Sequence, residues 1–248
     1  MALLLRDAHR LRGQGLSRQG LAGETLLELL GGATAALKIF PLPGAVVFPG
    51  TPAPFHVFEP RYRAMTADAL AGDRLLAVAT LRSPAQAELA RAPVHPVACA
   101  GFLEAHEELD DGRYNVLLRG ISRVRLLEEV EGTGRPYREF RVEILEDRYP
   151  AGGPPALASE VEALEQVVLE LARRLPAESG APDLAEAVAR MRVPARMADL
   201  VAAAVSGDAG TRLRILEELD VARRIDLVIR EVASTLLKAG PVGGGASA

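Results

Sequence analysis

The feature that most constrains the fold of this chain is a change of hydrophobic period at RYPAGGPPALAS, residues 148–159. Before it, short apolar or alternating runs are separated by turn residues, which is typical of an all-β region. After it, apolar residues recur at helical spacing. The stretch itself holds three Pro and two Gly and suits neither a strand nor a helix. The sequence therefore predicts an α+β chain, with a β domain over residues 37–150, a linker over 151–158 and an α-helical subdomain over 159–240.

The β domain is predicted to be a small barrel or closed sheet of about seven short strands around one helix. The alternation is clearest near its end, where Phe140, Val142 and Ile144 alternate with charged residues, so that one face is buried and one is wet. Asp111-Gly112 predicts a hairpin turn, because both residue types tolerate positive φ. The predicted strand runs are LKIFPL, AVVFPG, APFHVFE, RLLAVATL, VACAGFLEAHEEL, YNVLLRGI, SRVRLLEEV and YREFRVEIL.

Four or five helices are predicted after the linker. Ser159 with Glu162, and Asp183 with Glu186, fit the capping-box pattern at the start of the first two. ARMADLVAAAVSG predicts a third helix. The long segment TRLRILEELDVARRIDLVIREVASTLLKAG can break into two where Asp220 caps its second part.

The two ends of the chain carry weaker patterns. Residues 1–36 are punctuated by glycine and are predicted to be an N-terminal extension that is partly disordered. Gly240 is predicted to end the last helix. Residues 241–248, PVGGGASA, are predicted to be a flexible tail.

Charge and composition limit the classes of function. The net charge is −4 and the basic residues form no run, so there is no electrostatic case for nucleic acid. No apolar run reaches transmembrane length, and the stub in MALLLRDAHR is too short for a secretory signal, so no membrane is expected. Cys99 is the single cysteine, which excludes a disulfide framework and a cysteine zinc site. These features fit a cytoplasmic protein.

The stretch PFHVFEPRYRAM, residues 54–65, can be interpreted as a working site or as a structural corner. His56 and Glu59 have the three-residue spacing that can hold a metal on a helix. Pro60 instead favours an extended Glu59, and in a strand the two side chains would point to opposite faces. Pro60 also fits the first turn of a helix, where the helix dipole favours the Glu59 carboxylate. We interpret the stretch as a strand-to-helix corner and predict no metal.

Patterns of catalysis are weak. Lys38 and Lys238 are the only lysines and neither follows Gly, so a phosphate-binding loop of the Gly-Lys-Ser/Thr type is absent. GISRV around Ser122 lacks the second Gly of a nucleophile elbow. Ser234 and Lys238 lie one helical turn apart, but no oxyanion hole accompanies them, and we interpret them as an exposed pair. We predict no catalytic residue and no cofactor.

Several separated blocks carry a resemblance to a known family. IFPLPGAVVFPGTPAPFHVFEPRYRAM resembles the N-terminal substrate-binding domain of the Lon ATP-dependent protease, through its Phe-Pro-Leu start, its Phe-Pro-Gly turn and its His-x-Phe-Glu-Pro-Arg-Tyr-Arg junction. DGRYNVLLRGISRVRL is similar to the family's Asp-Gly-Arg hairpin and the Gly-x-x-Arg strand that follows. PYREFRVEIL and MADLVAAAVSGDAGTRLRILEELDVARRIDLVIREV extend the resemblance over residues 37–238. The residues that match the motif and are interpreted as structural are His56, Glu59, Pro60, Arg61, Arg63 and Gly112.

The resemblance implies a PUA-like β-barrel with one inserted helix, followed by an α-helical bundle. It also implies recognition of protein clients rather than catalysis. Lon proteases continue into an ATPase module and a serine–lysine peptidase, and the 248 residues hold neither. We therefore expect a stand-alone, non-catalytic protein-binding module. Its expected partners are unfolded or specific client proteins and a protease or chaperone, while the sequence leaves the oligomeric state open.

The aromatic residues near the junction are the candidates for contact with a client. Phe58, Tyr62 and Tyr114 would meet an extended segment that adds to a sheet edge or docks in an apolar groove. A solvent-exposed apolar patch around these residues would support the choice, and complete burial of all three would rule it out.

The alternative function is RNA binding, because PUA-like barrels often bind RNA. Arg113, Arg119, Arg123 and Arg125 lie close together in sequence on predicted neighbouring strands. A shared basic surface would favour this alternative, and the acidic balance of the chain speaks against it. An enzyme ranks last, since no constellation of residues supports one.

Overall fold

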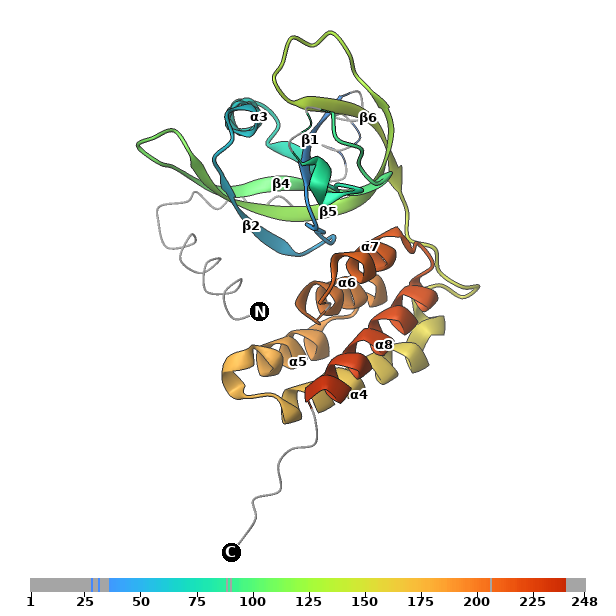
Figure 1. Cartoon of the computed structure of the whole chain (residues 1–248). Coiled ribbons are helices and arrows are strands. Elements are labelled where there is room, and N and C mark those ends of the chain that lie inside the picture. Colours follow the sequence, from blue (N-terminus) through green and yellow to red (C-terminus); the bar gives the residue numbers. More distant parts are fainter. Residues whose placement is uncertain are drawn as a thin grey trace, which may run out of the picture. The chain divides into compact units, whose positions relative to one another are not determined.

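A computed structural model of the chain describes Glu28, Gly31 and residues 36–87, 89, 91–205 and 207–239 (Figure 1). Most of the predicted N-terminal extension, the predicted flexible tail and Gly240 lie outside the described residues. The chain forms two compact units, which we call the sheet unit and the helical unit. The sheet unit runs to Glu146 and also includes Asp208–Glu217. The helical unit comprises Asp147–Gly207 and the chain from Glu218 onward.

Six strands form one sheet in the order β2-β5-β4-β3-β1-β6, and β5 also pairs with β6. The pairings therefore run in a closed circuit through β5, β4, β3, β1 and β6, while β2 pairs with β5 outside that circuit. Only the β1–β3 pair is parallel among these pairings. The predicted α+β class is confirmed. The strands are β1 Leu37–Leu42, β2 Pro52–Val57, β3 Leu75–Thr80, β4 Val97–Glu108, β5 Tyr114–Glu129 and β6 Arg138–Leu145.

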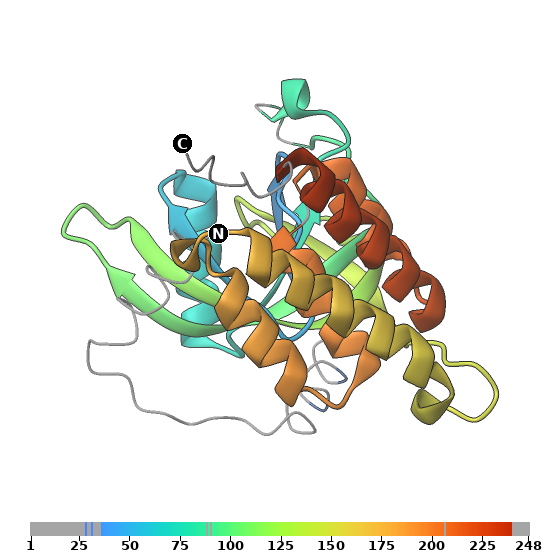
Figure 2. The same cartoon turned by 90° about the horizontal axis from the view of Figure 1, so that it is seen from below.

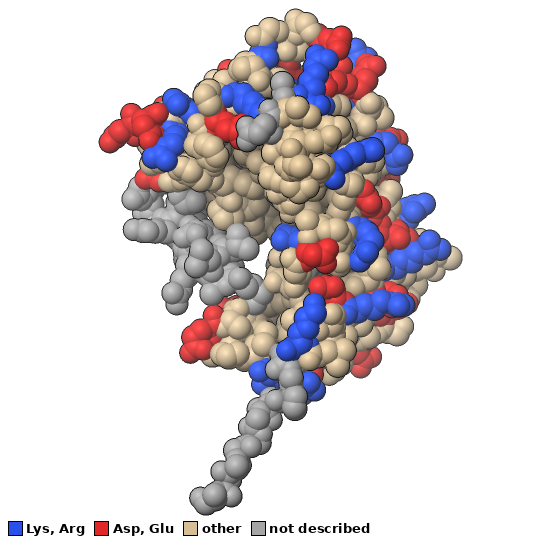
Figure 3. All heavy atoms as spheres, in the orientation of Figure 1, with Lys and Arg blue, Asp and Glu red and all other residues tan. Residues whose placement is uncertain are grey.

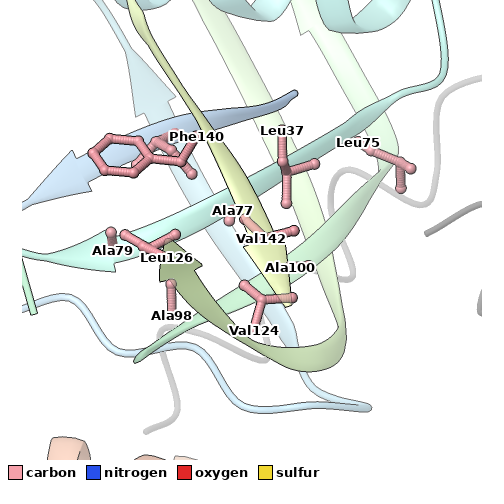
Figure 4. Packing of buried hydrophobic residues seen from close by; sticks show 11 residues of the cluster. Leu37, Leu75, Ala77, Ala79, Ala98, Ala100, Val124, Leu126, Phe140 and Val142 are labelled. Carbon is pink, nitrogen blue, oxygen red and sulfur yellow. The ribbon is translucent and has the colours of Figure 1, made fainter. Parts of the chain in front are cut away.

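The core of the closed circuit is made by alternate residues of its strands (Figure 4). Residues two apart along a strand point to the same side, so each strand contributes two or three side chains to one cluster. Alanines occupy the inward positions of β4 and most of those of β3, and they leave room for larger side chains from β1, β5 and β6. The cluster consists of Leu37, Ile39, Leu75, Ala77, Ala79, Ala98, Ala100, Val124, Leu126, Phe140 and Val142.

Helix α3, Pro60–Ala71, follows β2 almost directly, so the predicted strand-to-helix corner is confirmed. Pro60 lies in the first turn, where its missing N–H removes no helical hydrogen bond. Glu59 is the extended N-cap residue and makes no side-chain cap bond. Its carboxylate instead accepts a hydrogen bond from Arg61 Nε at 2.9 Å. The buried face of α3 is formed by Tyr62, Met65, Thr66 and Ala69.

The run AVVFPG is a buried loop, and the prediction of a strand there was wrong. Two of its carbonyls accept hydrogen bonds from side chains. Thr80 Oγ1 donates to the Ala45 carbonyl at 2.7 Å, and Arg212 Nη2 donates to the Val46 carbonyl at 2.7 Å. A short apolar run predicts burial well, but burial alone does not require a strand.

Strand β5 is continuous where two separate strands were predicted. Gly120 lies near its middle, and its backbone is approached closely by the preceding loop. A Cβ at this position would lie 2.2 Å from the Phe48 carbonyl oxygen and 3.1 Å from the Cys99 sulfur. Glycine is therefore required here because the Phe48 backbone approaches closely, and Gly120 does not mark the end of a strand.

Helix α7, Ala209–Glu217, belongs to the sheet unit although it falls within the predicted helical subdomain. Asp208 Oδ1 accepts a hydrogen bond from the Thr211 N–H at 2.8 Å at the start of the helix. Arg123 Nε, from β5, donates to the Leu216 carbonyl at 2.8 Å in its last turn. The last carbonyls of a helix lack partners within it, so this contact both caps α7 and holds it to β5.

The helical unit contains α4 Ala158–Arg174, α5 Ala181–Arg190, α6 Pro194–Val205 and α8 Val221–Ala239. Helices α4 and α8 lie side by side (Figure 2). Asp220 caps α8, because its Oδ1 accepts the Arg223 N–H at 3.1 Å, which confirms the predicted break. Within the described ranges, none of the helices has the length and apolar character needed to cross a bilayer.

The two predicted capping boxes of the helical unit were wrong. α4 follows a 3-10 turn, Pro154–Leu157, and already begins at Ala158, so Ser159 lies inside it. α5 begins at Ala181 after left-handed Gly180, so Asp183 lies in its first turn. In both cases the turn before the helix, rather than the side-chain motif, sets where the helix begins.

Arg224 is fully buried in the helical unit, and acidic groups of the same unit surround its guanidinium. Its Nη2 lies 2.5 Å from Asp147 Oδ1, and its Nη1 lies 3.5 Å from Asp199 Oδ1. Its Nε donates to the Glu218 carbonyl at 2.8 Å. A buried charge is tolerated when it is paired in this way, so Arg224 ties α8 to α6 and to the chain before α4.

Candidate functional site

Part of the β4–β5 pair, with β2 beside it, projects from the closed circuit as a three-stranded arm (Figure 1). β3 pairs with β4 only as far as Phe102, so the later part of β4 pairs with β5 alone. We define the arm as β2, Glu104–Glu108 of β4, the turn at 109–113 and Tyr114–Arg119 of β5. Of the candidate and motif residues that the sequence singled out, it carries His56, Gly112 and Tyr114, and Phe58 follows β2 directly.

The turn at the tip of the arm depends on Gly112. Its φ of 74° lies in the left-handed region that favours glycine. Its N–H donates to the Leu109 carbonyl at 2.7 Å, and the Leu109 N–H donates to the Arg113 carbonyl at 2.8 Å. A Cβ on Gly112 would lie 2.2 Å from Nη2 of Arg63, so the Arg63 guanidinium lies directly against the turn. Arg63 thereby connects the first turn of α3 with the tip of the arm.

The register gives the arm two different faces. Tyr114 and Val116 of β5 lie opposite Val57 and Phe55 of β2. These four alternate residues form an inner, mainly buried face, and Phe55 contacts Phe40 edge-on at a ring-centroid distance of 5.5 Å. The opposite face carries His56, Asn115 and Glu107 in one row across the three strands. We call this second surface the His56 face.

A directed chain of hydrogen bonds runs across the His56 face. Arg113 Nη1 donates to His56 Nε2 at 3.2 Å, and an arginine can only donate, so the imidazole hydrogen lies on Nδ1. His56 Nδ1 then donates to Asn115 Oδ1 at 2.8 Å, and Asn115 Nδ2 donates to Glu107 Oε2 at 2.9 Å. At the other end, Arg113 Nε donates to Asp111 Oδ2 at 2.5 Å. Each donor has an acceptor, so the chain fixes the His56 ring in one orientation.

Phe58 is the exposed aromatic residue of this surface. Its side chain is 60% exposed, whereas most large apolar side chains of the described chain are buried. Its ring stacks on His56 with centroids 6.3 Å apart and an interplanar angle of 25°. The hydrogen bonds that hold the His56 ring therefore also hold the Phe58 ring that stacks on it, and the Phe58 ring remains exposed to solvent.

Two of the three predicted contact residues do not lie on the surface. Tyr62 is 5% exposed and Tyr114 is 7% exposed, so the choice of these two as direct contacts is corrected. The Tyr62 hydroxyl donates to the Pro41 carbonyl at 3.4 Å. Burial raises the pKa of Tyr62, and burial followed by the nearby Glu108 carboxylate raises the pKa of Tyr114. Both tyrosines point to the inner face, because the strand register and the turn of α3 place them there.

The chain is similar to known proteins over most of its length. The sequence profile of the ATP-dependent protease La (LON) substrate-binding domain matches residues 36–234. The chain belongs to this family. The Lon protease of Anaeromyxobacter dehalogenans is 29% identical over 197 residues, which cover 79% of this chain and 22% of that protein. Lon protease 2 of Myxococcus xanthus is 28% identical over 195 residues, covering 78% of this chain and 23% of that protein. The chain thus matches less than a quarter of the length of these relatives.

Solved structures support the Lon-family fold. The N-terminal domain of the Mycobacterium avium complex Lon protease aligns with a TM-score of 0.64 and 16% identity, covering 80% of this chain and 98% of that one. The Lon N-terminal domain protein from Xanthomonas campestris aligns with a TM-score of 0.54 and 19% identity, covering 79% and 97%. The family resemblance inferred from the sequence is therefore confirmed.

The Lon-family motif residues form contacts that connect β2, α3 and the arm. Arg61 bridges Glu59, with Nη2 at 2.8 Å from its carboxylate, and lies over the Tyr62 ring at 4.5 Å. Arg63 lies against Gly112. Among the described residues there is no group of three or more His, Cys, Asp or Glu side chains that could hold a metal ion. We interpret these residues, as the sequence suggested, as parts of the corner.

The four arginines considered for RNA binding do not form a shared basic surface. Arg113 pairs with Asp111 at 2.5 Å, Arg119 with Glu104 at 2.9 Å and Arg125 with Glu143 at 3.2 Å. Arg123 is buried and caps α7. Because three of the charges are paired with carboxylates and one is internal, the arrangement does not favour phosphate binding.

The role of Asn115, Glu107 and Arg113 in the His56 face was missed at the level of the sequence. A signal for it existed. Once the Asp111-Gly112 turn sets the hairpin, Asn115 lies opposite Glu107, and pairing of β2 then brings His56 opposite Asn115. The second pairing joins segments far apart in the chain, which is why local patterns did not reveal it.

Proposed function

We propose that this Lon-family domain is a non-catalytic module that binds exposed segments of other proteins through the His56 face, with Phe58 as the central contact. The exposed Phe58 ring stacked on His56 carries the proposal. A large aromatic side chain held in one position contacts a partner with little loss of conformational entropy on binding. The family description as a substrate-binding domain agrees with this role.

Neighbouring residues suit the same use. Pro52 and Pro54 alternate with His56 along β2, so they share its face, and both are partly exposed. Together with Phe58 they form an apolar strip bordered by the polar row of Asn115 and Glu107. An apolar strip with a polar border is the usual composition of a peptide-binding surface.

The expected partners remain part of the proposal. Unfolded or specific client proteins would provide the bound segment, and a full-length protease or a chaperone would act on it afterwards. The relatives named Lon protease are matched over only part of their length, so their activity is not transferred to these residues. No cofactor enters the proposed role.

The test is binding of a labelled, permanently unfolded protein, reduced and carboxymethylated, to the full chain after nuclease treatment. Phe58→Ala is expected to weaken binding by about tenfold, as for a central aromatic contact. Leu127→Ala is the matched control, because Leu127 is also in the sheet unit and is 58% exposed. Equal effects of the two changes would contradict the proposal, and binding that is seen without nuclease treatment but lost after it would favour RNA.

A further inference from the structure

The two edges of the arm present different backbone groups. In an antiparallel ladder, hydrogen-bonded and non-hydrogen-bonded pairs alternate. The Leu109 N–H donates to the Arg113 carbonyl at 2.8 Å, and the Gly120 N–H donates to the Thr51 carbonyl at 2.9 Å. Following the register from these two bonds shows which residues turn their backbone groups outward. On β2 these are Pro52, Pro54 and His56, and on β4 they are His106 and Glu108.

The β2 edge is a poor template for another strand. Pro52 and Pro54 have no N–H, so the outward donors of β2 reduce to the N–H of His56. Proline at an outward position is a common way in which proteins prevent the addition of a strand. An extended client is therefore not expected to pair along β2.

The outer edge of β4 in the arm, Glu104–Glu108, keeps its donors and acceptors. His106 and Glu108 are exposed, and each offers one N–H and one carbonyl away from β5. Among the described residues no strand pairs with this side of β4 beyond Phe102. A short extended segment can therefore add here through backbone hydrogen bonds.

Charge selects the occupant of this edge. Five carboxylates lie between Glu104 and Asp111. Arg119 pairs with Glu104 and Arg113 pairs with Asp111, while Glu107, Glu108 and Asp110 have no basic ion-pair partner among the described side chains. Figure 3 shows acidic side chains gathered at the end of the arm. A second copy of this chain would bring the same negative edge against itself, so like charges oppose self-pairing.

We propose that the β4 edge, Glu104–Glu108, binds an extended, Lys- or Arg-rich segment of a client protein as an added strand. The inference rests on the proposed function and specifies the client segment and the backbone that receives it. Phe58, on the far side of β5, would contact a different part of the same client. The acidic edge and the aromatic surface are therefore separable in an experiment.

The first test uses a labelled nonapeptide of alternating Lys and Val, and a control peptide of alternating Glu and Val. The Lys–Val peptide is expected to bind at least tenfold more tightly, with an affinity that falls as salt rises. Glu108→Gln, which leaves the Asn115–Glu107 bond of the His56 face in place, should reduce this preference severalfold. Equal binding of the two peptides would overturn the inference.

The second test is His106→Pro, which removes an outward N–H but no hydrogen bond to β5. Binding of the Lys–Val peptide should weaken about tenfold, whereas His106→Ala, which keeps the N–H, should change it less than twofold. Circular dichroism would check the fold of both variants. In the unaltered chain, hydrogen exchange of the His106 and Glu108 amides should slow when peptide binds, and unchanged exchange would refute strand addition there.

The outcomes separate the two proposals. If Phe58→Ala weakens client binding while His106→Pro does not, the function of the His56 face stands and strand addition at β4 is wrong. If neither the unfolded protein nor the Lys–Val peptide binds, the proposed function itself fails.

Discussion

Within the closed circuit, β4 and β5 point Ala98, Ala100 and Val124 into a cluster that excludes water. Further along the same two strands, in the arm, one face still packs inward through Tyr114, but the other carries Glu107 and Asn115 in a hydrogen-bonded row. In both regions β4 and β5 pair antiparallel. What differs is the set of neighbouring strands, because β3, β1 and β6 complete the circuit around one part of the pair and β3 pairs with β4 only as far as Phe102. The pairing partners therefore decide whether the side chains of β4 and β5 are buried or exposed.

The largest expected effect tests the closed circuit. Leu75→Ala removes a fully buried side chain from the cluster and should lower the free energy of unfolding by about 2–5 kcal/mol, because a cavity remains. Urea unfolding followed by circular dichroism would measure it. Leu127→Ala, at an exposed position of β5, should change stability by less than about 0.5 kcal/mol. Similar losses for the two variants would show that the cluster is not the main source of stability.

A smaller effect is expected at the tip of the arm. Gly112→Ala introduces a Cβ at a φ of 74° and displaces the Arg63 guanidinium, with an expected loss of about 1–2 kcal/mol. Gly132→Ala is a matched control, since its φ is 72° and nothing lies within 4 Å of the added Cβ. The difference between the two losses in urea unfolding measures the Arg63 contact. That difference should vanish when Arg63 is first replaced by Ala, and its persistence would contradict the contact.

The smallest expected effect is a pH dependence at the same turn. The Arg113 backbone N–H, and then its guanidinium, lower the pKa of Asp111. A carboxyl whose pKa is lowered on folding stabilises the fold above its unfolded pKa of about 3.9, and this contribution is lost as the pH falls through the folded value. The stability difference between the unaltered chain and Asp111→Asn should therefore be present at neutral pH and disappear in acid. A difference that is constant with pH, measured by urea unfolding, would refute this assignment.

The neighbouring carboxyl provides the control for that experiment. Asp110→Asn changes the same charge one residue away, where no hydrogen bond joins the side chain to the described residues. It should give a smaller pH-dependent difference than Asp111→Asn. An equal difference would mean that the overall negative charge of the turn, rather than the Arg113 contacts, is responsible.

The sequence predicted those parts of the fold that depend on neighbouring residues. Pro60 marks the start of α3, Asp220 separates α7 from α8, and Asp111-Gly112 makes the hairpin. In each case a single residue limits φ, removes a donor or supplies an acceptor within its own turn. The change from a period of two to a helical period likewise follows from local spacing, and it was enough to give the α+β class.

The candidate site was predicted only in part. The sequence selected Phe58, which is exposed, but equally Tyr62 and Tyr114, which are buried. All three are aromatic residues near one junction, and nothing local distinguishes them. Their exposure depends on how β2 pairs with β5 and where α3 lies, and both involve residues far apart in the chain.

The sequence by itself thus determined the α+β class, the hairpin that forms the arm, and the family. Only the tertiary structure decided that AVVFPG is a loop, that α7 packs with the sheet unit, and that β2 and β4 offer unlike edges. The physical reason is that local residues restrict the backbone of their own turn or strand. Strand register, closure of the sheet and the capping of α7 by Arg123 are contacts between distant segments, and these contacts set which groups remain free to bind.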